Sequence, residues 1–120
     1  MTAAKTKIGC QLNCWQRELD FRTPEWGKLQ NGLAQLRQAG YSGVEVPSWS
    51  VPSLQEPERL RDACAAHDVT LVSLHAGGPF FDDAAYRDQT LVRVLPVAEC
   101  AARAGAVALV VSNATMKGKV

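Results

Sequence analysis

Hydrophobic and polar residues alternate with two different periods along this chain. Four short apolar stretches are separated by three longer segments in which apolar residues recur every three or four positions. Alternation with a period of two is typical of a strand, and a period near 3.6 is typical of a helix. The predicted order is strand, helix, strand, helix, strand, helix, strand, which favours an α/β fold with a parallel sheet.

The first three predicted strands each have an apolar and a polar face. In the third strand, Val72 and Leu74 share the face opposite that of His75. The last strand is a continuous apolar run, which predicts burial on both faces. The four strands are predicted at residues 7–13, 41–46, 71–78 and 107–112.

Capping signals mark the helices between the strands. Residues 23–25, Thr-Pro-Glu, combine a capping hydroxyl with a proline in the first turn, and Gly40 suits the end of that helix. Ser53 and Glu56 have the spacing of a capping box for the second helix. The third helix is predicted over residues 84–104. Its predicted buried face consists of Leu91, Leu95, Ala98 and Ala102.

Polar and aromatic residues gather at the carboxyl ends of the predicted strands. Parallel strands end at the same edge of a sheet, where ligands bind in such folds, so these side chains are expected to converge on one surface. The candidate binding residues are Asn13, Trp15, Glu45, Trp49, His75 and Phe80.

Several of these candidates also have a purely structural interpretation. Glu45 could be an interior carboxylate held by hydrogen bonds, although the cost of burying a charge favours a paired or functional role. Trp15 and Trp49 could belong to the core, or they could form an aromatic wall that stacks on a sugar ring. His75 precedes two glycines, which should leave it approachable.

Composition narrows the class of protein. The chain has 120 residues, of which 47% are hydrophobic and 21% charged, and its formal net charge is +1. This predicts one domain, residues 1–120, with a real hydrophobic core and no nucleic-acid partner. Neither a signal-peptide pattern nor a membrane-length apolar run is present in the sequence, so we expect a cytoplasmic protein with no membrane partner.

The four cysteines form no C-x-x-C pair. If Cys10 and Cys14 both lay on an extended strand, they would be about 13 Å apart, too far for a disulfide. Cys64 and Cys100 lie in predicted helices. Buried free thiols are therefore expected at the cysteine positions.

Four segments of the sequence resemble the N-terminal half of the xylose isomerase-like barrels, the sugar phosphate isomerase/epimerase superfamily. The matching pieces are Lys7-Ile8-Gly9 with Gln11-Leu12, Leu36 to Val46 with its Gly-Tyr-Ser-Gly-Val-Glu run, Leu71 to Gly77, and Ala104-Gly105-Ala106 leading to Val110-Val111. The resemblance implies a TIM (β/α)8 barrel of roughly 250 residues. This chain would supply the first four strands, so a truncated barrel is expected.

The resemblance also implies a function for the complete barrel. It implies a metal-dependent isomerase or epimerase of a small sugar or polyol, with Glu45 and His75 lining the substrate pocket. The divalent metal would be Mn, Mg, Co or Zn. Its ligands and the catalytic acid–base carboxylates would lie on later strands, outside this chain. A sugar dehydratase is an equally compatible member of the superfamily.

Two alternative functions are also compatible with the sequence. The chain could be a non-catalytic half-barrel that needs the missing C-terminal half or a homo-oligomeric partner, because an isolated half-barrel has two open sheet edges. It could also belong to an endonuclease IV-like DNA-repair enzyme, a branch of the same superfamily in which early-strand histidines bind zinc. His75 would then be a possible metal ligand.

Overall fold

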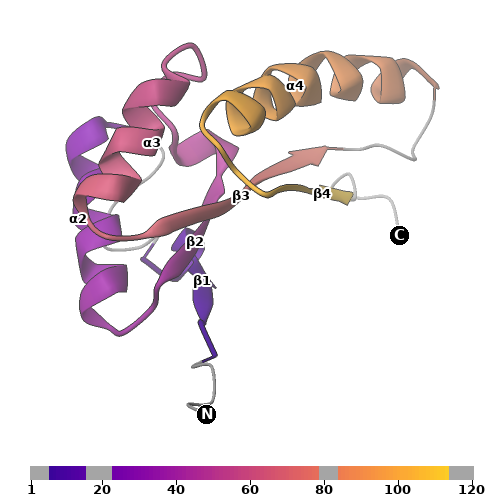
Figure 1. The fold of residues 1–120 in the computed structure, drawn as a ribbon. Coiled ribbons are helices and arrows are strands. Elements are labelled where there is room, and N and C mark those ends of the chain that lie inside the picture. Colours follow the sequence, from indigo (N-terminus) through magenta and orange to yellow (C-terminus); the bar gives the residue numbers. More distant parts are fainter. Residues whose placement is uncertain (1–5, 16–22, 79–83, 114–120) are drawn as a thin grey trace.

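A four-stranded parallel sheet organises the chain (Figure 1). The computed structural model describes residues 6–15, 23–78 and 84–113. The strands lie in the order β1-β2-β3-β4, which confirms the predicted parallel α/β architecture. The elements are β1 (Gly9–Gln11), the 3-10 turn η1 (Leu12–Trp15), α2 (Trp26–Gln38), β2 (Gly43–Pro47), the 3-10 turn η2 (Ser48–Ser50), α3 (Pro57–Ala66), β3 (Thr70–Gly78), α4 (Ala84–Arg103) and β4 (Ala108–Asn113).

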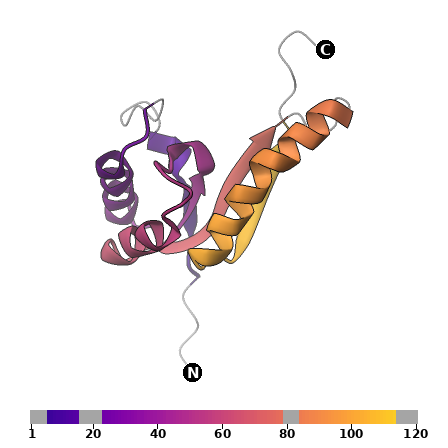
Figure 2. The same cartoon turned by 90° about the horizontal axis from the view of Figure 1, so that it is seen from above.

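The helices cover one face of the sheet (Figure 2). When neighbouring parallel strands follow in chain order, right-handed crossovers place every connecting helix on the same side. The core fills the space between the helices and that face. Its largest fully buried side chains include Leu12, Val44, Val46 and Leu74 from the strand side and Leu29, Leu33, Leu36 and Leu60 from the helices. The opposite face of the sheet is free to carry polar side chains.

The helix ends follow the sequence signals better than the helix starts. Gly40 and Gly105 adopt positive φ angles of 100° and 82°, as expected for residues that end a helix. The predicted capping role of Thr23 is wrong, because α2 begins at Trp26 and its N-cap is Glu25. Thr23 instead accepts a hydrogen bond from Lys28 Nζ at 2.8 Å through its side-chain oxygen.

The second helix starts at its proline rather than at the predicted capping box. Pro57 is the first residue of α3, where its missing N–H costs nothing, and Glu56 is the N-cap without a side-chain cap bond. The Ser53 hydroxyl accepts a bond from the Gln55 backbone N–H at 3.2 Å, which stabilises the preceding turn.

The predicted buried face of the third helix is wrong. Leu91 and Leu95 are 49% and 64% exposed. The stripe that packs into the core is rotated around the helix and consists of Thr90, Val94, Val97, Cys100, Ala101 and Ala104. Both sides of α4 are apolar, so helical periodicity alone does not choose between them.

The prediction that the fourth strand is buried on both faces is also wrong, because Val110 and Val111, which alternate along it, are 38% and 47% exposed. β4 pairs with β3, and within the described chain no strand lies on its other side. Val107, just before this strand, is 82% exposed. This end of the molecule therefore presents apolar side chains and open backbone groups together.

A register shift separates Val72 and Leu74, for which the sequence predicts a shared face. The pairing between β2 and β3 shifts at Val44 and Glu45, and Val72 is the extra residue on β3. A Cβ placed on Gly43 would lie 2.9 Å from a Val72 methyl group, so Val72 lies against the face opposite the helices. Leu74 is fully buried beneath the helices.

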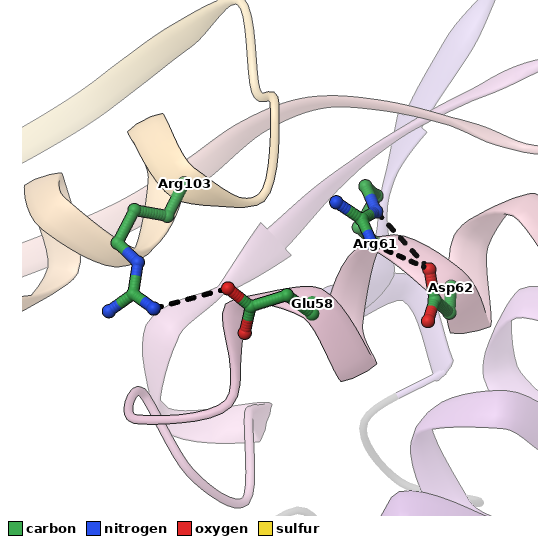
Figure 3. Close-up of polar contacts among 4 residues, drawn as sticks. All are labelled: Glu58, Arg61, Asp62 and Arg103. Carbon is green, nitrogen blue, oxygen red and sulfur yellow. Dashed lines mark hydrogen bonds and ion pairs between the residues drawn. The ribbon is translucent and has the colours of Figure 1, made fainter.

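An exposed ion pair joins α3 to α4 (Figure 3). Arg103 Nη2 lies 3.1 Å from Glu58 Oε1. The pKa of Glu58 is lowered, first by its own backbone N–H in the first turn of α3 and then by Arg103, against an opposing effect of burial. Arg61 pairs with Asp62 at 3.1 Å on α3.

In the described part of the chain, no helix is both long and apolar enough to cross a membrane.

Candidate functional site

The candidate site lies on the sheet face opposite the helices, where polar residues from neighbouring strands stand side by side. Gln11 of β1 is paired in register with Glu45 of β2, and Glu45 is paired with Ser73 of β3. Each residue alternates with a neighbour that faces the helices, so the three side chains share the free face. The sheet register therefore builds a row of polar groups across three strands.

Gln11 is the centre of a hydrogen-bond network. Its Nε2 donates to Glu45 Oε1 at 2.6 Å and lies 3.3 Å from Nδ1 of His75. Its Oε1 accepts a bond from Asn13 Nδ2 at 3.2 Å. An amide has two N–H donors and a carbonyl acceptor, and this arrangement uses all of them. The orientation of the Gln11 amide is thereby fixed by its neighbours.

The same bonds assign the hydrogen on His75. Nδ1 accepts from Gln11, so the ring carries its hydrogen on Nε2 and donates it to Ser112 Oγ, 2.7 Å away on β4. The Ser112 hydroxyl then has its own hydrogen to donate. The network thus reaches all four strands.

Glu45 is held by neutral donors. Besides Gln11, the Ser73 hydroxyl donates to Glu45 Oε2 at 3.0 Å. Ser73 is only 3% exposed, whereas Glu45 is half-buried. Hydrogen bonds therefore hold the Glu45 carboxylate on the face of the sheet that the helices leave free. A carboxylate has about four lone-pair positions, so further hydroxyl donors could still bind it.

The three aromatic candidates fall in different surroundings. The Trp49 ring lies edge-on to the His75 ring with centroids 5.4 Å apart, and Trp49 is 42% exposed. Trp15 is partly buried against the hydrophobic core. Phe80 lies outside the described residues. Of the predicted candidates, the structure brings together Asn13, Glu45, Trp49 and His75.

An open hollow of about 410 Å³ lies beside the network. The polar residues that line it are Lys7, Gln11, Glu45 and Ser73. The other lining residues are Gly9, Cys10, Val44 and Val72. The hollow is large enough for a small organic ligand.

The described residues do not fit a metal centre. Glu45 and His75 offer two possible ligands, and catalytic sites such as those of zinc enzymes commonly take three from the protein. Gln11 stands between these two residues and uses His75 Nδ1, while Ser112 uses Nε2. Among the residues that the structure describes, no group of three or more His, Cys, Asp or Glu side chains is placed to hold a metal ion.

Sequence reasoning missed the central residue of this network. Alternation puts Gln11 on the polar face of the first strand, but it does not show which residue of the next strand lies beside it. Ser73 and Ser112 escape notice as hydrogen-bond partners for the same reason. The register of adjacent strands is the missing information, and it is set by long-range packing.

The cysteine pair near this site is closer than the sequence indicates. β1 ends at Gln11 and the chain turns through η1, so Cys10 Sγ and Cys14 Sγ are 3.5 Å apart. The assumption of an extended strand is wrong. Cys64 and Cys100 are buried free thiols as predicted, and burial raises the pKa of Cys64 to about 12. The prediction of burial is wrong for Cys14, which is exposed, and holds only in part for Cys10, which is half-buried.

Comparison with known proteins identifies no family for this chain. No protein-family model matches the sequence, and no curated protein matches it significantly. The class that the structure defines is an α/β fold with four parallel strands in chain order, alternating with helices.

Proposed function

We propose that this chain forms half of a xylose isomerase-like barrel whose polar sheet face binds a small sugar or polyol. The complete barrel would be an isomerase or epimerase. The observation that carries the proposal is the network in which Gln11 orders Glu45 and His75. Parallel strands in chain order with helices on one side are also the arrangement of successive strands in such a barrel.

The chemistry of the network suits hydroxyl groups. Glu45 can accept further hydrogen bonds from a ligand hydroxyl, while Ser112 can donate one. Trp49 adds an exposed apolar surface next to His75, against which the C–H face of a sugar ring could pack. Side chains that are already held in position lose little conformational entropy when a ligand binds.

The catalytic centre of the proposed enzyme would lie on further strands. Residues of those further strands would hold the divalent metal, Mn, Mg, Co or Zn, and would include the acid–base carboxylates, so Lewis-acid and proton-transfer chemistry would be supplied there. In this chain, Gln11, Glu45, Ser73 and His75 would orient the substrate, and no proton-transfer step is assigned to them. Binding to these residues should therefore survive removal of divalent metal.

Calorimetric titration tests this proposal. D-xylose, D-xylulose and xylitol would be titrated into the 120-residue chain, once with EDTA and once with Mn²⁺. We expect saturable binding of at least one compound in EDTA, weakened about tenfold or more by Gln11→Leu, which corresponds to about 1.4 kcal/mol. Gln30→Leu, on the exposed surface of α2, is the matched control. Absence of binding by all three compounds would contradict the proposal.

A second candidate, a half-barrel completed by association, is favoured by the exposed sheet edges. Ile8, before β1, is 61% exposed, and Val107, before β4, is 82% exposed. Two copies could place β4 of each beside β1 of the other and close a ring of parallel strands. Light scattering would then give twice the 13.0 kDa mass of one chain. Val107→Lys should restore the single mass, and a native chain that is already monomeric would exclude this assembly.

A further inference from the structure

We propose that Cys10 and Cys14 form a redox-active pair that closes reversibly to a disulfide and clamps the segment carrying Gln11 and Asn13. The two sulfur atoms are 3.5 Å apart in the thiol form. The proposal concerns the chemistry of this pair and does not depend on what the polar face binds.

The geometry requires only a small movement. A disulfide has a sulfur–sulfur distance of about 2.05 Å, so the two sulfurs must approach by roughly 1.5 Å. Rotation about the side-chain bonds can supply such a movement. Cys10 lies in β1, and Cys14 lies in η1, which follows β1 directly.

The two thiols have different surroundings, which gives them different roles. Cys14 is exposed, whereas Cys10 is half-buried. Burial raises the pKa of the Cys10 thiol, and the neighbouring Cys14 raises it further. Cys14 is therefore the thiol that meets an oxidant first, and Cys10 is the thiol that resolves the intermediate. Cys64 and Cys100 are buried away from such a reaction.

Hydrogen peroxide is a sufficient oxidant for this reaction. The Cys14 thiolate attacks one peroxide oxygen, the O–O bond breaks, and hydroxide leaves and takes a proton to become water. Cys14 is then a sulfenic acid. The Cys10 thiolate attacks the Cys14 sulfur, the S–S bond forms, and the S–O bond breaks with release of a second water. Two thiols and one peroxide thus give one disulfide and two waters.

Closure would act directly on the polar network. The ring closed by the disulfide would include Gln11 and Asn13, whose side chains are hydrogen-bonded to each other at 3.2 Å. Cys10 Sγ also donates to the Gln11 backbone oxygen at 3.5 Å in the thiol form. Because Gln11 Nε2 contacts His75, a change in this segment should reach the His75 ring. A disulfide in a small ring with one exposed sulfur, that of Cys14, should also be readily reduced.

Mass spectrometry of the native chain tests whether the pair closes. Trypsin cleavage after Lys7 and Arg17 isolates residues 8–17, which contain Cys10 and Cys14 and no other cysteine. After peroxide treatment and alkylation, we expect this peptide to be lighter by two hydrogen atoms and to lose both alkylation sites. Dithiothreitol should restore both sites. Cys64 and Cys100 lie in other peptides and serve as internal controls.

The clamp is tested by the histidine signals in the same samples. The chain has two histidines, so NMR distinguishes His75 from His67 with one His67→Gln variant. Oxidation should shift the His75 signal and leave the His67 signal in place, and in Cys14→Ser it should shift neither. Intermolecular disulfides, or sulfinic acid without ring closure, would contradict the proposal that Cys10 and Cys14 form a redox-active pair. Ring closure with an unmoved His75 signal would overturn the clamp.

Discussion

The side chains of Gln11 and Glu45 are joined by a hydrogen bond of 2.6 Å, although 34 positions separate the two residues in the sequence. The contact joins the first two strands on the face that the helices leave free. It also connects the Glu45 carboxylate to the His75 ring, because the same Gln11 nitrogen lies 3.3 Å from His75 Nδ1. Gln11 is therefore the residue on which the organisation of this face depends.

Replacing Gln11 by leucine should lower stability. Gln11→Leu keeps a similar volume but removes the donor to Glu45 and the contact to His75. A half-buried polar group that loses its partner costs about 1–3 kcal/mol of unfolding free energy. Urea unfolding followed by circular dichroism measures the change.

The matched variant Gln30→Leu should change the unfolding free energy by less than about 0.5 kcal/mol, because this residue is exposed. Equal losses in the two variants would show that the network contributes nothing specific to the fold.

The rotated face of α4 predicts opposite behaviour for two nearby residues. Val97 is 4% exposed and Leu95 is 64% exposed. Val97→Ala should cost about 1.5–3 kcal/mol, from lost burial and the cavity left behind, whereas Leu95→Ala should cost less than about 0.5 kcal/mol. Chemical denaturation of both variants decides the point, and the reverse order of losses would restore the face predicted from the sequence.

Two glycines, one within α2 and one just after it, should change the stability in opposite directions when replaced by alanine. Gly40 has a φ of 100°, which disfavours any side chain, so Gly40→Ala should cost about 1–2 kcal/mol. Gly27 lies in α2, and a methyl group added there would meet open space, so Gly27→Ala should stabilise by about 0.5–1 kcal/mol. Thermal melts of the two variants measure this, and a stabilising Gly40→Ala would contradict the helix end described above.

The ion pair at Glu58 predicts a pH dependence in the acid range. The pKa of Glu58 in the folded chain lies below its ordinary value of 4.5. The unfolded chain therefore binds the proton first, so the contribution of Glu58 is complete above pH 4.5 and is lost as pH falls through the lower folded value. Urea unfolding of native and Glu58→Gln chains should differ at neutral pH and converge in acid.

Arg103→Met separates the contribution of Arg103 from the other causes that lower the Glu58 pKa. The backbone N–H of Glu58 lowers the pKa of this carboxyl more than the charge of Arg103 does. In chains that carry Arg103→Met, the pH-dependent difference between Glu58 and its glutamine replacement should therefore shrink without disappearing. Complete loss of this difference would show that Arg103 alone lowers the pKa of Glu58.

The sequence predicts the parallel order of the elements because period and spacing are local properties. Gly40 and Gly105 end their helices as expected, since a positive φ favours glycine. The errors occur where the decision is made by a distant part of the chain. Neither the buried side of α4 nor the exposed edge at Val111 can be read from local periodicity, because both depend on which neighbours cover them.

In the candidate site, too, local patterns are predicted from the sequence, whereas contacts between distant parts of the chain are not. The sequence places His75 and Glu45 near one edge of the sheet, and the structure joins them through Gln11. Trp15, by contrast, packs against the core. The short turn η1 could not be anticipated from the alternation of residues 7–13, and that turn brings Cys10 close to Cys14.

The most direct measurement is the NMR signal of the His75 ring during titration of the native chain with xylitol, D-xylose and D-xylulose. We expect a saturable shift of the His75 signal with at least one compound, an unmoved His67 signal, and an affinity lower by about tenfold or more in Gln11→Leu. An unmoved His75 signal with all three compounds, or the same affinity in Gln11→Leu, would contradict the claim that this face binds a sugar or polyol.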